Sequence, residues 1–175
     1  IVVTFMRTLM GLPPVVVGII VYVLFSGTGP FGNLGLIYSV KLMIIAQVVL
    51  ITPIVAGMTE TAISPIVKNA LPSLKGMGAN PFKRVFLIIG ESKYQLIAVY
   101  LFAFARAISE VGAVQIVGGN ILYKTRVMTT AIALNYNTGD FSMAIALGFI
   151  LLMISLCVNC VAALLQFGLK RRKHA

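Results

Sequence analysis

The segment from Lys68 to Lys93, KNALPSLKGMGANPFKRVFLIIGESK, is the one long polar interruption in a chain that otherwise consists of apolar runs. It holds five of the fourteen Lys and Arg residues, and its centre, Gly76 to Pro81, is rich in the residues that favour turns. Because apolar runs lead into and out of it, we expect a cytosolic docking loop between transmembrane helices.

The composition excludes a soluble globular domain. The chain of 175 residues is 59% hydrophobic and only 10% charged, and its mean hydropathy is +1.03. One core of this size cannot hide so much apolar surface from water. We therefore expect an all-α integral membrane protein whose first partner is the lipid bilayer.

The basic residues form short clusters beside apolar runs and not one solvated face, which argues against a nucleic-acid partner despite the formal charge of +10. In membrane proteins such clusters mark the cytoplasmic side. Placing the docking loop and the C-terminus in the cytosol puts three basic residues outside, one in the membrane and ten inside, the ten being Arg7, Lys68, Lys75, Lys83, Arg84, Lys93, Lys170, Arg171, Arg172 and Lys173.

Apolar runs of bilayer length predict four transmembrane helices, at about 9–25, 37–58, 94–117 and 141–168, with a cytosolic coupling loop at 59–93. We expect the helix of the second span to continue into this loop as far as Ala70. The chain begins with Ile, so we expect it to lack its natural N-terminus, with further spans upstream and no signal peptide to be sought. The basic cluster from Lys170 to His174 is expected to be a stop-transfer anchor.

Each polar or helix-breaking residue inside the first two spans has two possible roles. Pro13 and Pro14 either kink the first helix or line a pathway, since membrane helices tolerate proline where neighbours satisfy the backbone. Gln47 and Pro53 are expected to make a helix-helix hydrogen bond and a kink, with a substrate contact as the alternative.

Arg106 and Glu110 are the least expected residues of the third span. Their spacing of four places them on one helical face within pairing distance. Because a charge in the hydrocarbon region costs at least ~2.5 kcal/mol, such a pair is by default a functional-site hypothesis. A plain salt bridge that locks two helices together is the alternative.

The segment from Asn120 to Gly139 is too polar for a span, but its central part, Val127 to Leu134, predicts a short helix at the outer surface. Its hydroxyl and amide side chains either donate to a passing anion or are ordinary interfacial groups; they are Thr129, Thr130, Asn135 and Asn137. Cys157 and Cys160 form a CxxC inside an apolar run without nearby His, so we interpret them as packing residues.

Motifs for chemistry are missing from this sequence. It has no G-x-x-x-x-G-K-[ST] loop for ATP, no cluster with metal-ligand spacing, and no pair of nucleophile and base, so we expect no enzyme. The glycines at 27, 29 and 32 fit GxGxxG, but they follow a membrane span and lack the acidic residue that a ribose contact needs. Energy for uphill transport would come from a partner or from an ion gradient.

The loop from Leu74 to Glu91 resembles the cytoplasmic signature loop of type I ABC importer permeases, with Gly76 to Pro81 as its small-residue turn. The stretch FARAISEVGA at 104–113 is similar to the segment after that loop in molybdate, sulfate and tungstate permeases. GLPPVVVG at 11–18, GPFGNLGL, GGNI, TRVMTTAIAL and GDF resemble the tungstate branch most closely. The resemblance covers essentially the whole chain. It departs at 72–74, where the family has Glu-Ala-Ala, and near 89–90, where it has Leu-Pro.

The resemblance implies alternating access in an importer for an oxyanion, most closely tungstate, in a prokaryotic cytoplasmic membrane. Two permease copies would enclose the pathway, a cytosolic ATPase dimer would bind ATP and Mg²⁺, and an extracytoplasmic binding protein would deliver the anion. No cofactor is implied in this chain. The ATPase-coupling residues would be Leu74, Lys75, Gly76, Met77, Gly78, Ala79, Asn80 and Pro81. The pathway or gate residues would be Arg106, Ser109, Glu110 and Gly112.

Three alternatives remain open at this stage. Molybdate or sulfate would use the same architecture, because discrimination resides in the binding protein. A gradient-driven carrier would make Glu110 indispensable and would transport without ATP. A membrane scaffold without transport activity would tolerate scrambling of Gly76 to Pro81.

Overall fold

A computed structural model describes residues 2–171, and the side chains of 4–161, 163 and 164 within that range. This part of the chain is helical and contains no strand. The elements in order are α1 (Val2–Leu9), α2 (Pro14–Phe25), the 3-10 turn η1 (Gly32–Leu34), α3 (Val40–Gly76), α4 (Pro81–Glu91), α5 (Lys93–Ile108), α6 (Gly112–Gly118), α7 (Met128–Asn137) and α8 (Phe141–Arg171).

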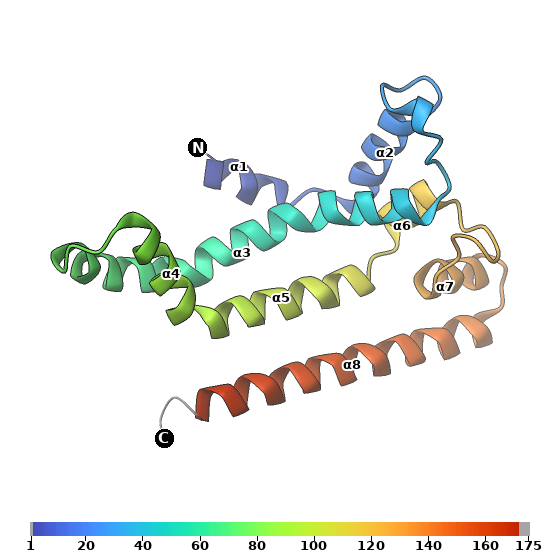
Figure 1. The fold of residues 1–175 in the computed structure, drawn as a ribbon. Coiled ribbons are helices and arrows are strands. Elements are labelled where there is room, and N and C mark those ends of the chain that lie inside the picture. The colour runs from blue at the N-terminus through green and yellow to red at the C-terminus, as the bar shows by residue number, and fades with distance from the viewer. Residues whose placement is uncertain (1, 172–175) are drawn as a thin grey trace.

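Three long helices run side by side and give the molecule its length (Figure 1). α3 packs against α5, and α5 packs against α8, each antiparallel to its neighbour. α4 lies across one end of this layer, while α2, α6 and α7 gather near the other end. The expected coupling loop therefore lies at one end of the long helices, and the expected gate residues near α6 lie toward the other end.

α3 is a single helix of 37 residues. At 1.5 Å per residue it is about 55 Å long, well beyond the ~30 Å of a bilayer core. The helix was expected to continue from the second span to Ala70, and it does so, ending at Gly76. Three prolines lie inside it without ending it. The expected loop over 59–93 is therefore mostly helix, with a turn between α3 and α4 and a bend at Ser92 between α4 and α5.

The run at 9–25, expected as one span, divides at its two prolines. α1 ends at Leu9, and α2 begins at Pro14 with Pro13 in an extended conformation at its N-cap. Proline is favoured at the first helical position, where no backbone N–H is needed, and it restrains the residue before it to extended geometry. The result is a helix of 12 residues, about 18 Å long.

The run at 94–117 is also broken. α5 ends at Ile108 and α6 begins at Gly112, so three residues separate two helices that the sequence predicts as one. Among residues 2–171, α3 and α8 are the helices long and apolar enough to cross a membrane, and α4 with α5 would add a third if that bent pair is counted. α2 is apolar but shorter.

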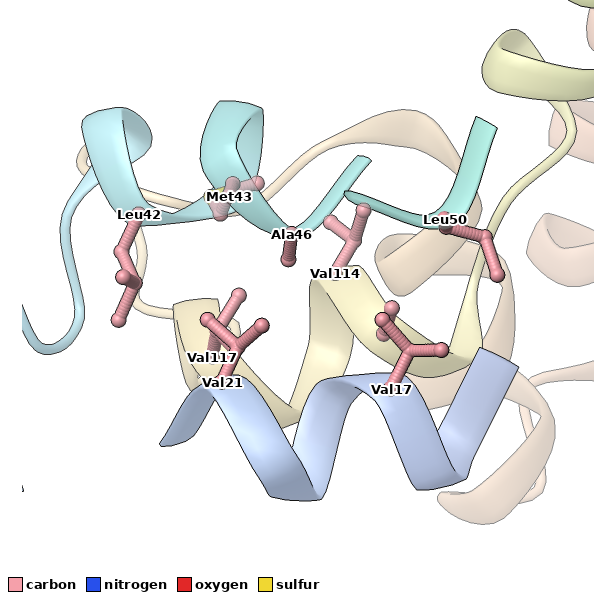
Figure 2. Close-up of a cluster of buried hydrophobic side chains, with 9 residues drawn as sticks. Val17, Val21, Leu42, Met43, Ala46, Leu50, Val114 and Val117 are labelled. Carbon is pink, nitrogen blue, oxygen red and sulfur yellow. The ribbon is translucent and has the colours of Figure 1, made fainter. Parts of the chain in front are cut away.

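The hydrophobic core lies where α2, α3 and α6 meet (Figure 2). Valines of α2 and α6 face an aliphatic stripe of α3 across this junction, and all are nearly inaccessible to solvent. Its members are Val17, Val21, Leu42, Met43, Ala46, Leu50, Ala113, Val114 and Val117. This cluster fixes α6, and with it the break after α5, against the first half of α3.

The polar segments between the longer helices form a short helix and a tight turn. α7 confirms the predicted short helix at 127–134, extended to Asn137. At the GxGxxG match, a Cβ on Gly29 or Gly32 would stand 2.2 or 2.3 Å from a backbone carbonyl oxygen, so these glycines permit a tight turn. α8 reaches Arg171, and the side chains of the basic cluster at 170–174 lie outside the described residues.

Candidate functional site

The turn between α3 and α4, residues Leu74 to Pro81, is here called the coupling segment. It closes α3 with a Schellman motif: the Ala79 N–H donates to Leu74 O at 3.2 Å and the Gly78 N–H to Lys75 O at 3.0 Å. Gly78 has φ +67°, the left-handed conformation that this motif requires. The turn is thus a defined structure and not a flexible linker.

The coupling segment is open to solvent and stands at the far end of α3 (Figure 1). Met77 at its apex is 72% exposed. Behind it, Arg84 of α4 folds back, and its Nε donates to Ala79 O at 2.6 Å. A rigid, exposed turn with a fixed backbone is suited to insertion into a cleft of another protein.

The second site is the break between α5 and α6, here called the polar junction and comprising Arg106, Glu110 and Gly112. Glu110 lies in the break itself, and its side chain is only 2% exposed. Its Oε2 accepts a hydrogen bond from Nη1 of Arg106 at 2.8 Å. Its Oε1 accepts from the Ala113 N–H at 3.3 Å. The pairing predicted from the spacing of four is confirmed.

The backbone of Glu110 is held as well as its carboxylate. Thr129 Oγ1 on α7 donates to Glu110 O at 3.1 Å. One residue therefore joins α5 through Arg106, α6 through Ala113 and α7 through Thr129. An ionised carboxylate can remain buried here because its charge is paired and its oxygens accept hydrogen bonds.

Gly112 belongs to the junction for a steric reason. A Cβ at this position would stand 3.0 Å from Cγ2 of Val15 and 3.6 Å from Oε1 of Glu110. Glycine thus lets α2 approach the junction closely. Ser109 lies beside the junction: the residue is exposed, and its Oγ donates to Arg106 O at 3.1 Å.

Gln47 links α3 to the last turn of α5, just before the break. Its Nε2 donates to Ala107 O at 3.2 Å, which confirms the expected helix-helix hydrogen bond. That carbonyl also accepts from the Glu110 N–H at 3.3 Å. The end of α5 is therefore fastened to α3 by a side chain and to the junction by its own backbone.

Two open grooves follow α3 past Gln47. One, of about 490 Å³, is lined by apolar residues of α3 together with Gln47, Thr52 and Ala107. The other, of about 320 Å³, lies where α3, α5, α7 and α8 converge, and its polar lining comes from Gln47, Glu110 and Thr129. The second groove brings together residues as far apart in the sequence as Val40 and Ile154.

Of the polar residues that were considered as anion donors on α7, Thr129, Thr130 and Asn135 make hydrogen bonds to backbone groups. Thr129 binds Glu110, as above, and Thr130 both accepts from the Val127 N–H and donates to Val127 O at 3.0 Å. Sequence reasoning missed the link from Thr129 to Glu110, and it missed Ala113 as a partner of the carboxylate. Neither contact has a local sequence signal, because each joins separate helices.

Groups suited to other chemistry do not gather within the described residues. No three His, Cys, Asp or Glu side chains there are placed to hold a metal ion. Cys157 and Cys160 are unpaired thiols on the exposed side of α8.

Comparison with known proteins gives one matching family model, described as "binding-protein-dependent transport system inner membrane component", over residues 1–171. The tungstate uptake system permease protein TupB of Peptoclostridium acidaminophilum is 45% identical over 91% of this chain and 70% of its own length. TupB of Campylobacter jejuni is 40% identical over 88% of this chain and 64% of its own length. A sulfate transport system permease protein, CysT, of Salmonella typhimurium is 26% identical over 92% and 61%. The chain thus spans about two thirds of the length of these relatives.

Proposed function

Because the chain belongs to the family of binding-protein-dependent transport system inner membrane components, we propose that it is the permease subunit of an ATP-driven importer for an oxyanion. Tungstate is the favoured substrate, since the two TupB relatives are the more similar ones and the sulfate permease relative is more distant. The observation that carries the proposal is this family match together with a rigid, exposed coupling segment at the end of a helix longer than a bilayer is thick.

The proposed topology has four crossings, made by the run at 9–25 that contains α2, by α3, by α5 with α6, and by α8. α5 alone is about 24 Å long, so the seven residues of α6 complete its passage. The coupling segment faces the cytosol, because that orientation places most basic residues inside. α3 then extends about 25 Å beyond the bilayer core and carries the coupling segment into the cytosol.

In this arrangement α3 connects the two sites mechanically. A cytosolic ATPase that grips the coupling segment moves the end of α3, and the bond from Gln47 to Ala107 passes that movement to the end of α5. The polar junction is attached to the same carbonyl. Alternating access would follow from displacement of the α5–α6 break relative to α3 and α7.

The proposed pathway runs along the groove lined by Gln47, Glu110 and Thr129. It is open on one side in the single chain, and a second copy of the chain would close it. The charge of Arg106 is neutralised by Glu110. A transported dianion would therefore not meet an unpaired cation that binds it too tightly to release it.

The test is uptake by vesicles that contain the chain, its ATPase and its extracytoplasmic binding protein. We expect tungstate uptake that requires ATP, and capture of the ATPase by the permease that is lost when Leu74 to Pro81 is deleted. Uptake without ATP would establish a gradient-driven carrier instead. Retained uptake after scrambling Gly76 to Pro81 would remove the coupling role. Competition among tungstate, molybdate and sulfate for the binding protein decides the substrate.

A separate test concerns the polar junction. Arg106→Glu places a second carboxylate beside the buried Glu110, so we expect it to abolish uptake. Unchanged uptake by Arg106→Glu would remove the junction from the pathway.

A further inference from the structure

α4 is an amphipathic helix whose apolar face is not covered within the described structure. Phe82, Val85, Phe86 and Ile89 have the i, i+3, i+4, i+7 spacing of one helical face. Phe82 is 87% exposed and Phe86 78% exposed. Two exposed phenylalanines on a helix of 11 residues form a surface that favours an apolar partner.

Cations flank this face. Lys83 is exposed at the edge of this face on α4, and Lys93 follows the helix at the start of α5. Nζ of Lys93 stands 5.2 Å from the ring centroid of Tyr94, an aromatic and basic pairing typical of the membrane interface. Arg84 is turned toward the coupling segment and does not contribute to this outer surface.

The direction of α4 follows from its junction with α5. The two helices are bent by 67° at Ser92, a buried residue whose Oγ donates to Ile88 O at 2.7 Å. Figure 1 shows α4 lying across the layer of α3 and α5 and not continuing it. If α5 crosses the bilayer, as the proposed function requires, α4 lies close to the plane of the membrane surface.

We propose that α4 lies in the headgroup region of the cytosolic leaflet, with Phe82, Phe86 and their neighbours inserted among the acyl chains. Lys83 and Lys93 would then contact anionic phospholipid headgroups. An amphipathic helix with an aromatic face and flanking cations has this affinity for an anionic bilayer surface. The coupling segment directly before it is polar and exposed, and it remains free for the ATPase.

This inference rests on the proposed function and gives α4 a defined task. Membrane contact on α4 and packing on α3 would hold the coupling segment from two sides, so that a push by the ATPase moves α3 and not the turn alone. The alternative is that the apolar face of α4 contacts a protein, above all the ATPase, and not the membrane.

Tryptophan fluorescence can distinguish these occupants, because the chain contains no Trp. Phe86→Trp places a single reporter on the apolar face, and Phe82→Trp provides a second if the first fails to fold. Leu87→Trp is the matched control on the same helix, pointing away from the apolar face. Tyr123→Trp, at a position 98% exposed in the loop before α7, is a second control, outside α4.

The full chain is reconstituted in phosphatidylcholine vesicles with and without phosphatidylglycerol, each with brominated acyl chains. We expect Phe86→Trp to emit at shorter wavelength and to be quenched several-fold more than Leu87→Trp or Tyr123→Trp. Adding Lys83→Glu should reduce the quenching in phosphatidylglycerol vesicles and leave it unchanged in pure phosphatidylcholine.

Quenching of Phe86→Trp and Phe82→Trp no greater than that of Tyr123→Trp would overturn the proposal. If, in addition, Phe86→Ser lost capture of the ATPase, the face would belong to a protein. Failure of the proposed function would appear separately, as absence of ATP-dependent uptake by the unsubstituted chain.

Discussion

Gly18 of α2 lies against the backbone of Ala113 in α6, so that a Cβ at Gly18 would stand 2.8 Å from Cα of Ala113. Backbone cannot give way as a flexible side chain can. The close contact of these two helices depends on the absence of a side chain, as is common where membrane helices pack on small residues. The contact also positions α6, whose first turn receives the carboxylate of Glu110.

Gly18→Ala is therefore expected to destabilise the protein by about 1–3 kcal/mol through overpacking, although alanine is the better helix former. Gly148→Ala is the matched control, because a Cβ at this helical glycine of α8 meets nothing within 4 Å. Thermal unfolding in detergent measures both. Equal stability of the two variants would contradict the close packing of α2 on α6.

Removal of one charged partner at the polar junction should lower the free energy of unfolding more than removal of both partners. Arg106→Gln leaves the buried carboxylate of Glu110 unpaired, and we expect a loss of about 3 kcal/mol, toward the low end for buried pairs because Arg106 is 33% exposed. Arg106→Gln with Glu110→Gln removes both charges and should recover part of that loss. A double-mutant cycle from denaturant unfolding measures the coupling. Additive effects would show that the pair contributes no interaction energy.

Local patterns predict the helices well but not their breaks. The spacing of Arg106 and Glu110 gives the ion pair, yet α5 already ends at Ile108. The break is stabilised by Glu110 accepting from Ala113 and by Thr129 donating to Glu110, contacts between helices that periodicity does not encode. Pro13 and Pro14, in contrast, carry a readable local signal for the start of a new helix.

For the coupling segment, the sequence predicts the turn but not the point at which the preceding helix ends. Gly76 to Pro81 predicts a turn from its composition alone. The continuation of α3 beyond Ala70, through Pro72, does not follow from propensity, because proline in a helix interior costs a backbone hydrogen bond. Membrane helices and their extensions tolerate such breaks where neighbouring elements compensate, and α4 packs against this part of the molecule.

Gln47 is expected to stabilise the protein through one hydrogen bond, the one from its Nε2 to Ala107 O. Gln47→Met keeps the length of the side chain but leaves Ala107 O with one donor fewer, and we expect a loss of about 1 kcal/mol. Thr52→Val is the control in the same groove, since Thr52 Oγ1 donates only to Val48 O within its own helix. Uptake provides a second readout: Gln47→Met should weaken ATP-dependent uptake, whereas Thr52→Val should not. The reverse order would remove Gln47 from the proposed mechanical link.

Gly78 tests whether the shape of the coupling segment, and not its side chains, carries the coupling. A Cβ at Gly78 meets nothing within 4 Å, so a substitution there acts only through φ +67°. Gly78→Val should cost about 1–2 kcal/mol in the left-handed conformation and distort the turn. Gly78→Asn should be tolerated better, because Asn adopts this conformation more readily.

Gly76→Ala, in the last turn of α3 with open space around it, is the control. We expect capture of the ATPase to fall in the order Gly76→Ala, Gly78→Asn, Gly78→Val; equal capture by all three would mean that the partner does not recognise the geometry of the turn.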